Sequence, residues 1–405
     1  MLAENSVLER VSGTVMVGVD VREMDALLAL QRATCAHAGV VMNRNTRLLH
    51  DLGQRLWLDN ITRDLLDSGT LARYVADLSV TGLTSNPTIF ERAISSGSAY
   101  DEAIQRLAAL GLSTEGIFFE LALQDLMRAA DLFRPTFDAS HGADGWASLE
   151  VSPLLANDAA RTVRAAAMLY ARAARPNLFI KIPGTPAGIV AIEESIYDGV
   201  PINVTLLFSR EHYVAAAEAY LRGIERRIQA GLDPSVDSVA SLFVSRWDVA
   251  VRDEISAQFQ NRLGIAMAMR TYKAYRELLA SARWKQLAAA GARPQRLLWA
   301  STGSKDPAAR DTLYVEALAA PDTINTIPEK TLLAFAEHGT VGEPLPADGG
   351  YAEAVLEEFR REGIDDAALA ARLQREAVEA FVGSWRELLA RIGEKSSHPA
   401  TVPSA

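Results

Sequence analysis

The chain has 405 residues, of which 49% are hydrophobic, and its formal net charge is -10 at pH 7. This apolar content allows a large buried core, whereas the acidic charge argues against a nucleic-acid-binding protein, which needs clustered lysine and arginine to contact phosphates. The one cysteine, Cys35, cannot form an internal disulfide, and no apolar run has the length of a membrane span. Because the N-terminus also lacks the basic and apolar stretches of a secretory signal, we expect a cytoplasmic enzyme.

The chain divides into three predicted parts. Residues 1–41 do not follow the pattern of the rest, and we expect them to be an N-terminal extension that is poorly defined or disordered. Residues 42–395 form the predicted single domain. Residues 396–405 are mostly small, polar or proline, which is typical of a flexible tail.

Within the predicted domain, short β-rich runs alternate with longer stretches of helical periodicity. This alternation predicts parallel strands joined by helical crossovers, and eight strands match an α/β fold of the (β/α)8 TIM barrel type. Because the chain exceeds the roughly 250 residues typical of this fold, we expect extra helices around 90–145 and after the eighth strand. The helix 376–392 should pack over the barrel or its mouth. The predicted strands are 56–60, 80–86, 146–152, 178–184, 201–209, 238–246, 296–302 and 322–328.

Lys181 is the most informative polar residue near a strand end, where the active sites of barrels lie. It interrupts the apolar run 178–182, and an unpaired ammonium group is costly to bury. One interpretation is a lysine at a strand edge that extends its charge to solvent. The other is an amine whose pKa is lowered by desolvation so that it attacks a carbonyl carbon. The Gly/Pro segment 183–188 that follows suits the rim of a barrel.

Four further polar residues lie at predicted strand ends, and a barrel would gather them around one opening. Asp59 and Glu150 supply two carboxyl groups for proton transfer, although either acid could equally cap a helix or lie on the surface. Asn86 and Asn203 could hold a substrate hydroxyl or simply fix a loop, because buried asparagines are usually fully hydrogen-bonded.

A second group of residues is suited to an anion. Arg246 and Lys305 could bind a phosphate with the Ser241 hydroxyl as a further donor, and ordinary surface charge is the alternative. No cofactor motif accompanies them, since the sequence has no HExxH, no GxGxxG after a strand, no GxxxxGK[ST] and no GxSxG. These absences argue against a zinc site and against a dinucleotide-binding or NTP-binding fold.

Two segments closely resemble the transaldolase family. Residues 82–90, GLTSNPTIF, are similar to the first signature of that family, and residues 178–194, LFIKIPGTPAGIVAIEE, to the signature around its Schiff-base lysine. The resemblance spans about 45–395 and is to the longer bacterial transaldolases, such as those of actinobacteria and cyanobacteria. Further similar segments occur in the same order: LWLDN, WASLEVSP, PINVTLLFS, SLFVSR and WASTGSKDPAARDTLYVEALAAPDTINTIPEKT.

The resemblance implies a transferase without metal or organic cofactor that uses sugar phosphates in the non-oxidative pentose phosphate pathway. A dihydroxyacetone unit would pass from sedoheptulose 7-phosphate to glyceraldehyde 3-phosphate, giving erythrose 4-phosphate and fructose 6-phosphate through a lysine Schiff base. The implied roles are Lys181 as nucleophile, Glu150 with a water held by Thr205 for proton transfer, Asp59 as acid and base at the C4 hydroxyl, Asn86 and Asn203 as ligands of the enamine hydroxyls, and Ser241, Arg246 and Lys305 as phosphate ligands.

Two rival functions are weighed against this one. Fructose-6-phosphate aldolases resemble the same family and use the same lysine, but they are shorter and carry a tyrosine at the position of Phe243. A phenol could protonate the enamine and a phenyl ring cannot, so Phe243 favours transfer. The other rival is an inactive barrel with a binding or regulatory role.

Two features remain open. Lys305 departs from the family pattern, which often has an arginine near this position of the phosphate site. The sequence also leaves the oligomeric state open.

Overall fold

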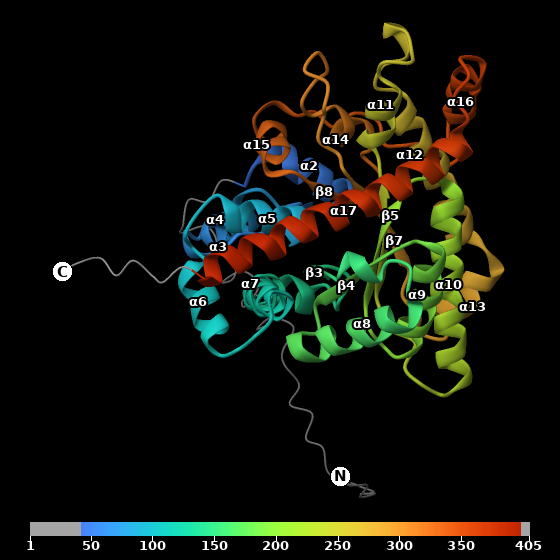
Figure 1. Ribbon diagram of the computed structural model, residues 1–405. Helices are drawn as coiled ribbons and strands as arrows, with labels where there is room; N and C mark the ends of the chain where they lie inside the picture. Colours follow the sequence, from blue (N-terminus) through green and yellow to red (C-terminus); the bar gives the residue numbers. More distant parts are fainter. Residues whose placement is uncertain (1–41, 398–405) are drawn as a thin grey trace, which may run out of the picture. The chain divides into compact units, whose positions relative to one another are not determined.

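The strands form the predicted (β/α)8 barrel (Figure 1). The computed structural model describes residues 42–397, so the predicted extension 1–41 and residues 398–405 of the predicted tail lie outside the described residues. Neighbouring strands are parallel, in the order β2-β1-β8-β7-β6-β5-β4-β3, and the Leu83 N–H donates to the Trp146 carbonyl at 2.9 Å where β2 meets β3. The strands are β1 (Arg55–Leu58), β2 (Val80–Leu83), β3 (Ala147–Glu150), β4 (Leu178–Pro183), β5 (Ile202–Leu207), β6 (Ser238–Phe243), β7 (Gln295–Ala300) and β8 (Ile324–Ile327).

Helices follow the strands, and the extra helices expected around 90–145 and after the eighth strand are present. Polar residues just after a strand often start the next helix: the Thr185 and Ser209 side chains accept the N–H groups of Gly188 and His212. The helices are α2 (Arg44–Leu52), α3 (Arg63–Asp67), α4 (Thr70–Asp77), α5 (Pro87–Ser95), α6 (Asp101–Ala109), α7 (Thr114–Ala139), α8 (Ala159–Ala173), α9 (Pro186–Tyr197), α10 (Arg210–Gln229), α11 (Ser245–Val251), α12 (Leu263–Ala280), α13 (Ala282–Ala289), α14 (Leu313–Ala317), α15 (Glu329–His338), α16 (Ala352–Arg361) and α17 (Asp366–Ser397), with 3-10 turns η1 (Pro153–Leu155) and η2 (Ala257–Phe259).

Aromatic side chains fill one end of the barrel interior. Phe179 on β4 stacks on Trp146 with ring centroids 3.9 Å apart, and the Trp57 ring lies 6.1 Å from Phe179. Because side chains alternate along a strand, Lys181, two residues beyond Phe179, points into the same interior. The aromatic layer therefore forms a buried floor, and Lys181 lies one layer nearer to the C-terminal ends of the strands.

Helix α17 crosses the barrel, as the red helix in Figure 1 shows. It packs against α5, α6, α7 and η1, and its residues Leu373, Glu376 and Phe381 line the cavity at the barrel mouth. The prediction that the helix 376–392 covers the mouth is confirmed. Among residues 42–397, no helix combines the length and the apolar character that a bilayer crossing requires.

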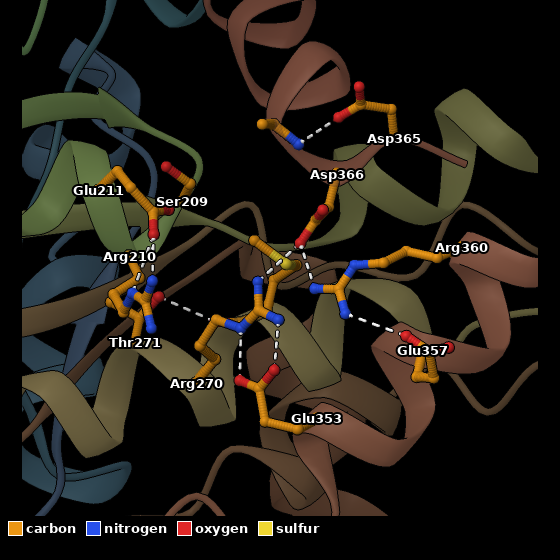
Figure 2. Close-up of polar contacts among 12 residues, drawn as sticks. Ser209, Arg210, Glu211, Arg270, Thr271, Glu353, Glu357, Arg360, Asp365 and Asp366 are labelled. Carbon is orange, nitrogen blue, oxygen red and sulfur yellow. Dashed lines mark hydrogen bonds and ion pairs between the residues drawn. The ribbon is translucent and has the colours of Figure 1, made fainter. Parts of the chain in front are cut away.

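The N-terminal end of α17 is held by a buried arginine on α12 (Figure 2). Arg270 makes two hydrogen bonds of 2.6 Å to Glu353 on α16 and a third of 2.6 Å to Asp366, the first residue of α17. Asp366 also accepts a bond of 3.2 Å from Arg360. A bidentate arginine contact fixes direction as well as distance, so this cluster orients the start of α17.

Candidate active site

A cavity of about 790 Å³ opens at the C-terminal ends of the strands. This volume lies in the range of typical small-molecule sites. Of the ten predicted site residues, Glu150 and Asn203 do not line the cavity but are buried next to residues that do. The other eight line it: Asp59, Asn86, Lys181, Thr205, Ser241, Phe243, Arg246 and Lys305.

Lys181 lies deep in the cavity with its side chain only 6% exposed. Its Nζ donates to the Ser85 carbonyl at 2.9 Å and lies 3.2 Å from Glu150 Oε2 on the neighbouring strand β3. The register of β3 and β4 pairs Glu150 with Lys181, which explains their closeness. The structure thus excludes the interpretation of Lys181 as an edge lysine that extends to solvent.

Both carboxyl groups of the site have raised pKa values. Burial raises the pKa of Asp59, and the ammonium of Lys181, a hydrogen bond from Thr84 and the charge of Lys305 oppose that shift. The Thr84 hydroxyl donates to Asp59 Oδ1 at 3.0 Å. Burial likewise raises the pKa of Glu150, against the attraction of Lys181. Carboxyl groups with raised pKa values are suited to proton transfer near neutral pH.

Hydroxyl and amide groups link the neighbouring strands behind Lys181. The Ser241 hydroxyl donates to Asn203 Oδ1 at 2.7 Å, and Asn203 Nδ2 donates to Ser148 Oγ at 3.2 Å. Asn203 is therefore fully buried and already engaged behind the cavity wall. Thr205 differs, because its buried hydroxyl has no hydrogen-bond partner among residues 42–397 although it lines the cavity. Such an atom is a natural position for a water or a substrate atom.

Three cationic side chains line the cavity besides Lys181: the predicted Arg246 and Lys305, and Arg92 on α5. Within residues 42–397, none of their side chains makes a hydrogen bond or an ion pair. The Arg246 guanidinium lies 5.5 Å from the Phe243 ring centroid, and burial lowers its pKa against the attraction of Glu376. Unpaired cations that share one cavity favour an anionic ligand.

Asn86 has a structural contact as well as a place in the cavity wall. Its side-chain oxygen accepts the Ile89 N–H at 3.0 Å and so caps α5. Sequence reasoning missed Arg92, which lies in the second turn of the same helix. An arginine shortly after the NPTIF segment was the available signal, but Arg92 is exposed like most arginines on helices, so the sequence offered no reason to assign it to the cavity.

The sequence analysis also missed two threonines. Thr84 directly follows β2, and Thr326 lies near the end of β8. Both threonines line the cavity, and their hydroxyl oxygens lie 2.6 Å apart. Thr84 was within the predicted strand 80–86, so its position near the cavity could have been expected. In the described part of the chain, no group of three His, Cys, Asp or Glu side chains is placed to hold a metal ion.

Together, the fold and the cavity define a (β/α)8-barrel enzyme with a buried lysine amine, two carboxyl groups and unpaired cations in one site. A model of the family Transaldolase/Fructose-6-phosphate aldolase matches residues 56–392, so the chain belongs to this family. A protein of Thermobifida fusca called "Transaldolase" is 45% identical over 356 residues, covering 86% of this chain and 97% of that protein. A "Transaldolase" of Saccharopolyspora erythraea is 44% identical over 87% of this chain and 98% of its own. A "Transaldolase" of Thiobacillus denitrificans is 44% identical over 86% of this chain and 99% of its own length.

Proposed function

We propose that this chain is a transaldolase that transfers a dihydroxyacetone unit from sedoheptulose 7-phosphate to glyceraldehyde 3-phosphate. The products would be erythrose 4-phosphate and fructose 6-phosphate, in the cytoplasm. The observation that carries the proposal is the Lys181 amine, buried beside Glu150 in a cavity with unpaired cations. The names of the similar proteins support the same reaction.

The first step is attack of the Lys181 nitrogen on the C2 carbonyl of the ketose. The amine must be neutral to attack, and Glu150, 3.2 Å away, is close enough to take its proton. The carbinolamine then loses water and becomes a protonated imine. A water between Glu150 and Thr205 would carry the protons of this step. Among the described residues, the buried Thr205 hydroxyl has no hydrogen-bond partner, whereas Glu150 Oε2 lies 3.2 Å from Lys181 Nζ.

Asp59 would then cleave the C3–C4 bond. Its carboxylate removes the proton from the C4 hydroxyl, the electrons of the bond move to the imine nitrogen, and an aldehyde leaves. The enamine that stays on Lys181 attacks the acceptor aldehyde, and Asp59 returns the proton. The raised pKa of Asp59 suits a group that must both accept and return a proton.

The phosphate of the substrates would bind Arg246 and Lys305, with Ser241 as a further donor. Arg246 follows β6 and Lys305 follows β7, so the two cations lie beside each other around the barrel. Asn86 lines the opposite part of the cavity, after β2, and would hold a hydroxyl of the enamine. Asn203 is a weaker candidate for that role, because its amide already contacts Ser148 and Ser241.

Phe243 supports transfer rather than simple cleavage. It lines the cavity, and its phenyl ring has no proton to give to the enamine. The enamine therefore waits for an aldehyde instead of being protonated and released as dihydroxyacetone. An assay of free dihydroxyacetone against erythrose 4-phosphate separates a fructose-6-phosphate aldolase from a transaldolase.

Reductive trapping tests the nucleophile. The protein is incubated with fructose 6-phosphate and borohydride, and its mass and its lysine-containing peptides are then measured. We expect an adduct on Lys181 in the wild type and none in Lys181→Ala. The variant Lys273→Ala, which removes an exposed lysine of α12, should be modified as the wild type is. A wild type without an adduct, or a Lys181→Ala protein with one, would overturn the proposal.

A further inference from the structure

Gln374 on α17 connects the covering helix to the two strands that carry Lys181 and Thr205. Its Nε2 donates to the Leu206 carbonyl on β5 at 2.9 Å and to the Gly184 carbonyl after β4 at 3.1 Å. A side-chain amide has two protons to donate, so both are used on the barrel backbone. Gln374 is thus bonded to the backbone of two strand segments. The side chain of the neighbouring Arg375, by contrast, is exposed.

The β5 backbone is irregular where Gln374 binds it. Leu206 has a φ of 59°, in the left-handed region that non-glycine residues rarely adopt, and the β5–β6 register shifts between Val204 and Leu207. Thr205 lies inside this irregular stretch. Its carbonyl accepts the Gly184 N–H at 2.7 Å, so the same two segments are also joined by the backbone.

This geometry gives Gln374 a specific effect. A left-handed non-glycine residue in a strand is strained and persists where its surroundings hold it. A bulge of this kind re-aims the neighbouring side chain. Here the neighbour is Thr205, whose unpartnered hydroxyl faces the cavity beside Lys181. A contact that holds the Leu206 backbone would therefore also hold the direction of the Thr205 hydroxyl.

We propose that Gln374 is a positioning residue for the transfer reaction, which acts through the Leu206 backbone on Thr205. This inference rests on the proposed function. Gln374 need not touch the substrate, since it is absent from the cavity wall while its neighbours Leu373 and Glu376 line it. Its loss should slow the steps of carbinolamine formation and dehydration and leave phosphate binding at Arg246 unchanged.

Steady-state kinetics of Gln374→Leu and Gln374→Glu test this proposal. Leucine removes both N–H donors of the Gln374 side chain. Glutamate keeps the shape of that side chain but cannot donate a hydrogen bond when it is ionised. If one of the two variants folds poorly, the other still provides the test. We expect kcat to fall about tenfold to a hundredfold, the scale of a small misplacement of a catalytic group. KM for fructose 6-phosphate should stay within about twofold. The control Arg375→Ala removes the adjacent exposed side chain and should match the wild type.

A double-mutant cycle with Thr205→Ala separates positioning from general damage. If Gln374 acts through Thr205, adding Gln374→Leu to Thr205→Ala should lower kcat by no more than about twofold. A full further decrease in that background would overturn the proposal.

Hydrogen–deuterium exchange of the peptide covering 202–208 gives a readout that does not depend on activity. It should rise in Gln374→Leu and not in Arg375→Ala, and unchanged exchange would overturn the proposal. A wild type that forms no borohydride adduct would instead refute the proposed function, while the exchange result still decides whether Gln374 holds β5.

Discussion

At the scale of single residues, replacing Asp59 should lower activity without lowering the stability of the fold. Burial raises its pKa, so the folded protein binds this proton more tightly than the unfolded chain does. The ionised carboxylate therefore lowers the stability of the fold at neutral pH, and the effect disappears as the pH falls toward about 4. We expect Asp59→Asn to lower kcat at least about a hundredfold. Its thermal unfolding midpoint at pH 7 should equal or exceed that of the wild type.

The pH dependence provides the control for this prediction. The difference in unfolding midpoint between Asp59→Asn and the wild type should shrink between pH 7 and pH 4.5, measured by calorimetry. Asp67→Asn changes an exposed carboxyl group of a surface ion pair with Arg128 and should shift stability by less than about 0.5 kcal/mol at either pH. An Asp59→Asn protein that is less stable at pH 7 would mean that the carboxylate stabilises the fold.

The residues of the site were predictable to different degrees. Lys181 stood out because a lysine inside an apolar strand is rare, yet the strand pattern left its direction open. The structure decides that direction through Phe179, whose ring stacks inside the barrel two residues earlier. Arg92 and Gln374 lie on helices where arginine and glutamine are ordinary, and no local pattern separates them from exposed residues. The Gln374 contact with Leu206 joins positions 168 apart in sequence.

At the scale of elements, the Arg270 cluster is expected to control the order of α17 (Figure 2). Arg270→Met keeps much of the buried length but removes the bonds to Glu353 and Asp366. Asp366 would remain largely buried, with its bond to Arg360 as its remaining partner. We expect a loss of about 1–3 kcal/mol in the free energy of unfolding, measured with denaturant. Hydrogen exchange over 366–381 should become faster.

A surface pair of the same chemistry is the matched control. Arg361 lies 3.4 Å from Glu357, and its side chain is 72% exposed. Arg361→Met should therefore change the free energy of unfolding by less than about 0.5 kcal/mol. If Arg270→Met left both stability and exchange unchanged, α17 would be held by its apolar contacts alone.

The strands were the most predictable elements, whereas the prediction of α17 covered only part of that helix. Buried parallel strands form short apolar runs, which the sequence displays, and each of the eight predicted runs overlaps a strand, with β1 and β7 starting one residue earlier than predicted. The last helix extends upstream of the predicted 376–392 to Asp366. Asp365 starts it by accepting the Ala367 and Ala368 N–H groups, a cap that an alanine-rich segment does not reveal by hydrophobic pattern.

At the scale of the whole molecule, the charge of the cavity opposes the charge of the chain. The formal net charge is -10, yet Arg92, Arg246 and Lys305 line the cavity without ion-pair partners among residues 42–397. Most arginines on the outer helices are paired, as Arg283 is with Glu218 and Glu225. Local unpaired cations in a concave site concentrate small anions even when the overall charge is negative. The acidic composition is therefore compatible with a phosphorylated substrate.

The predicted domain boundary at Met42 leads to a test on the complete fold. Asn43 caps α2 by accepting the Asn45 and Thr46 N–H groups, and it also donates to the Ala336 carbonyl at 2.8 Å. The family match begins at residue 56, and the relatives align over nearly their whole length with 86% of this chain. We expect a chain that starts at Met42 to unfold within about 1 °C of the full chain, because 1 kcal/mol shifts the unfolding midpoint of a domain of this size by about 1–2 °C. Its kcat and KM should also be unchanged.

A second truncation sharpens this test. A chain that starts at Gly53 lacks α2, whose Thr46 and Leu49 are fully buried against the barrel. Losing a buried leucine alone costs about 2–5 kcal/mol, so this shorter chain should unfold at a clearly lower temperature. Equal losses in the two truncated chains would place a required segment before Met42. A loss confined to the chain from Gly53 would mean that the barrel begins with the Asn43 cap, whose contact with the end of α15 joins the first described helix to the last barrel crossover.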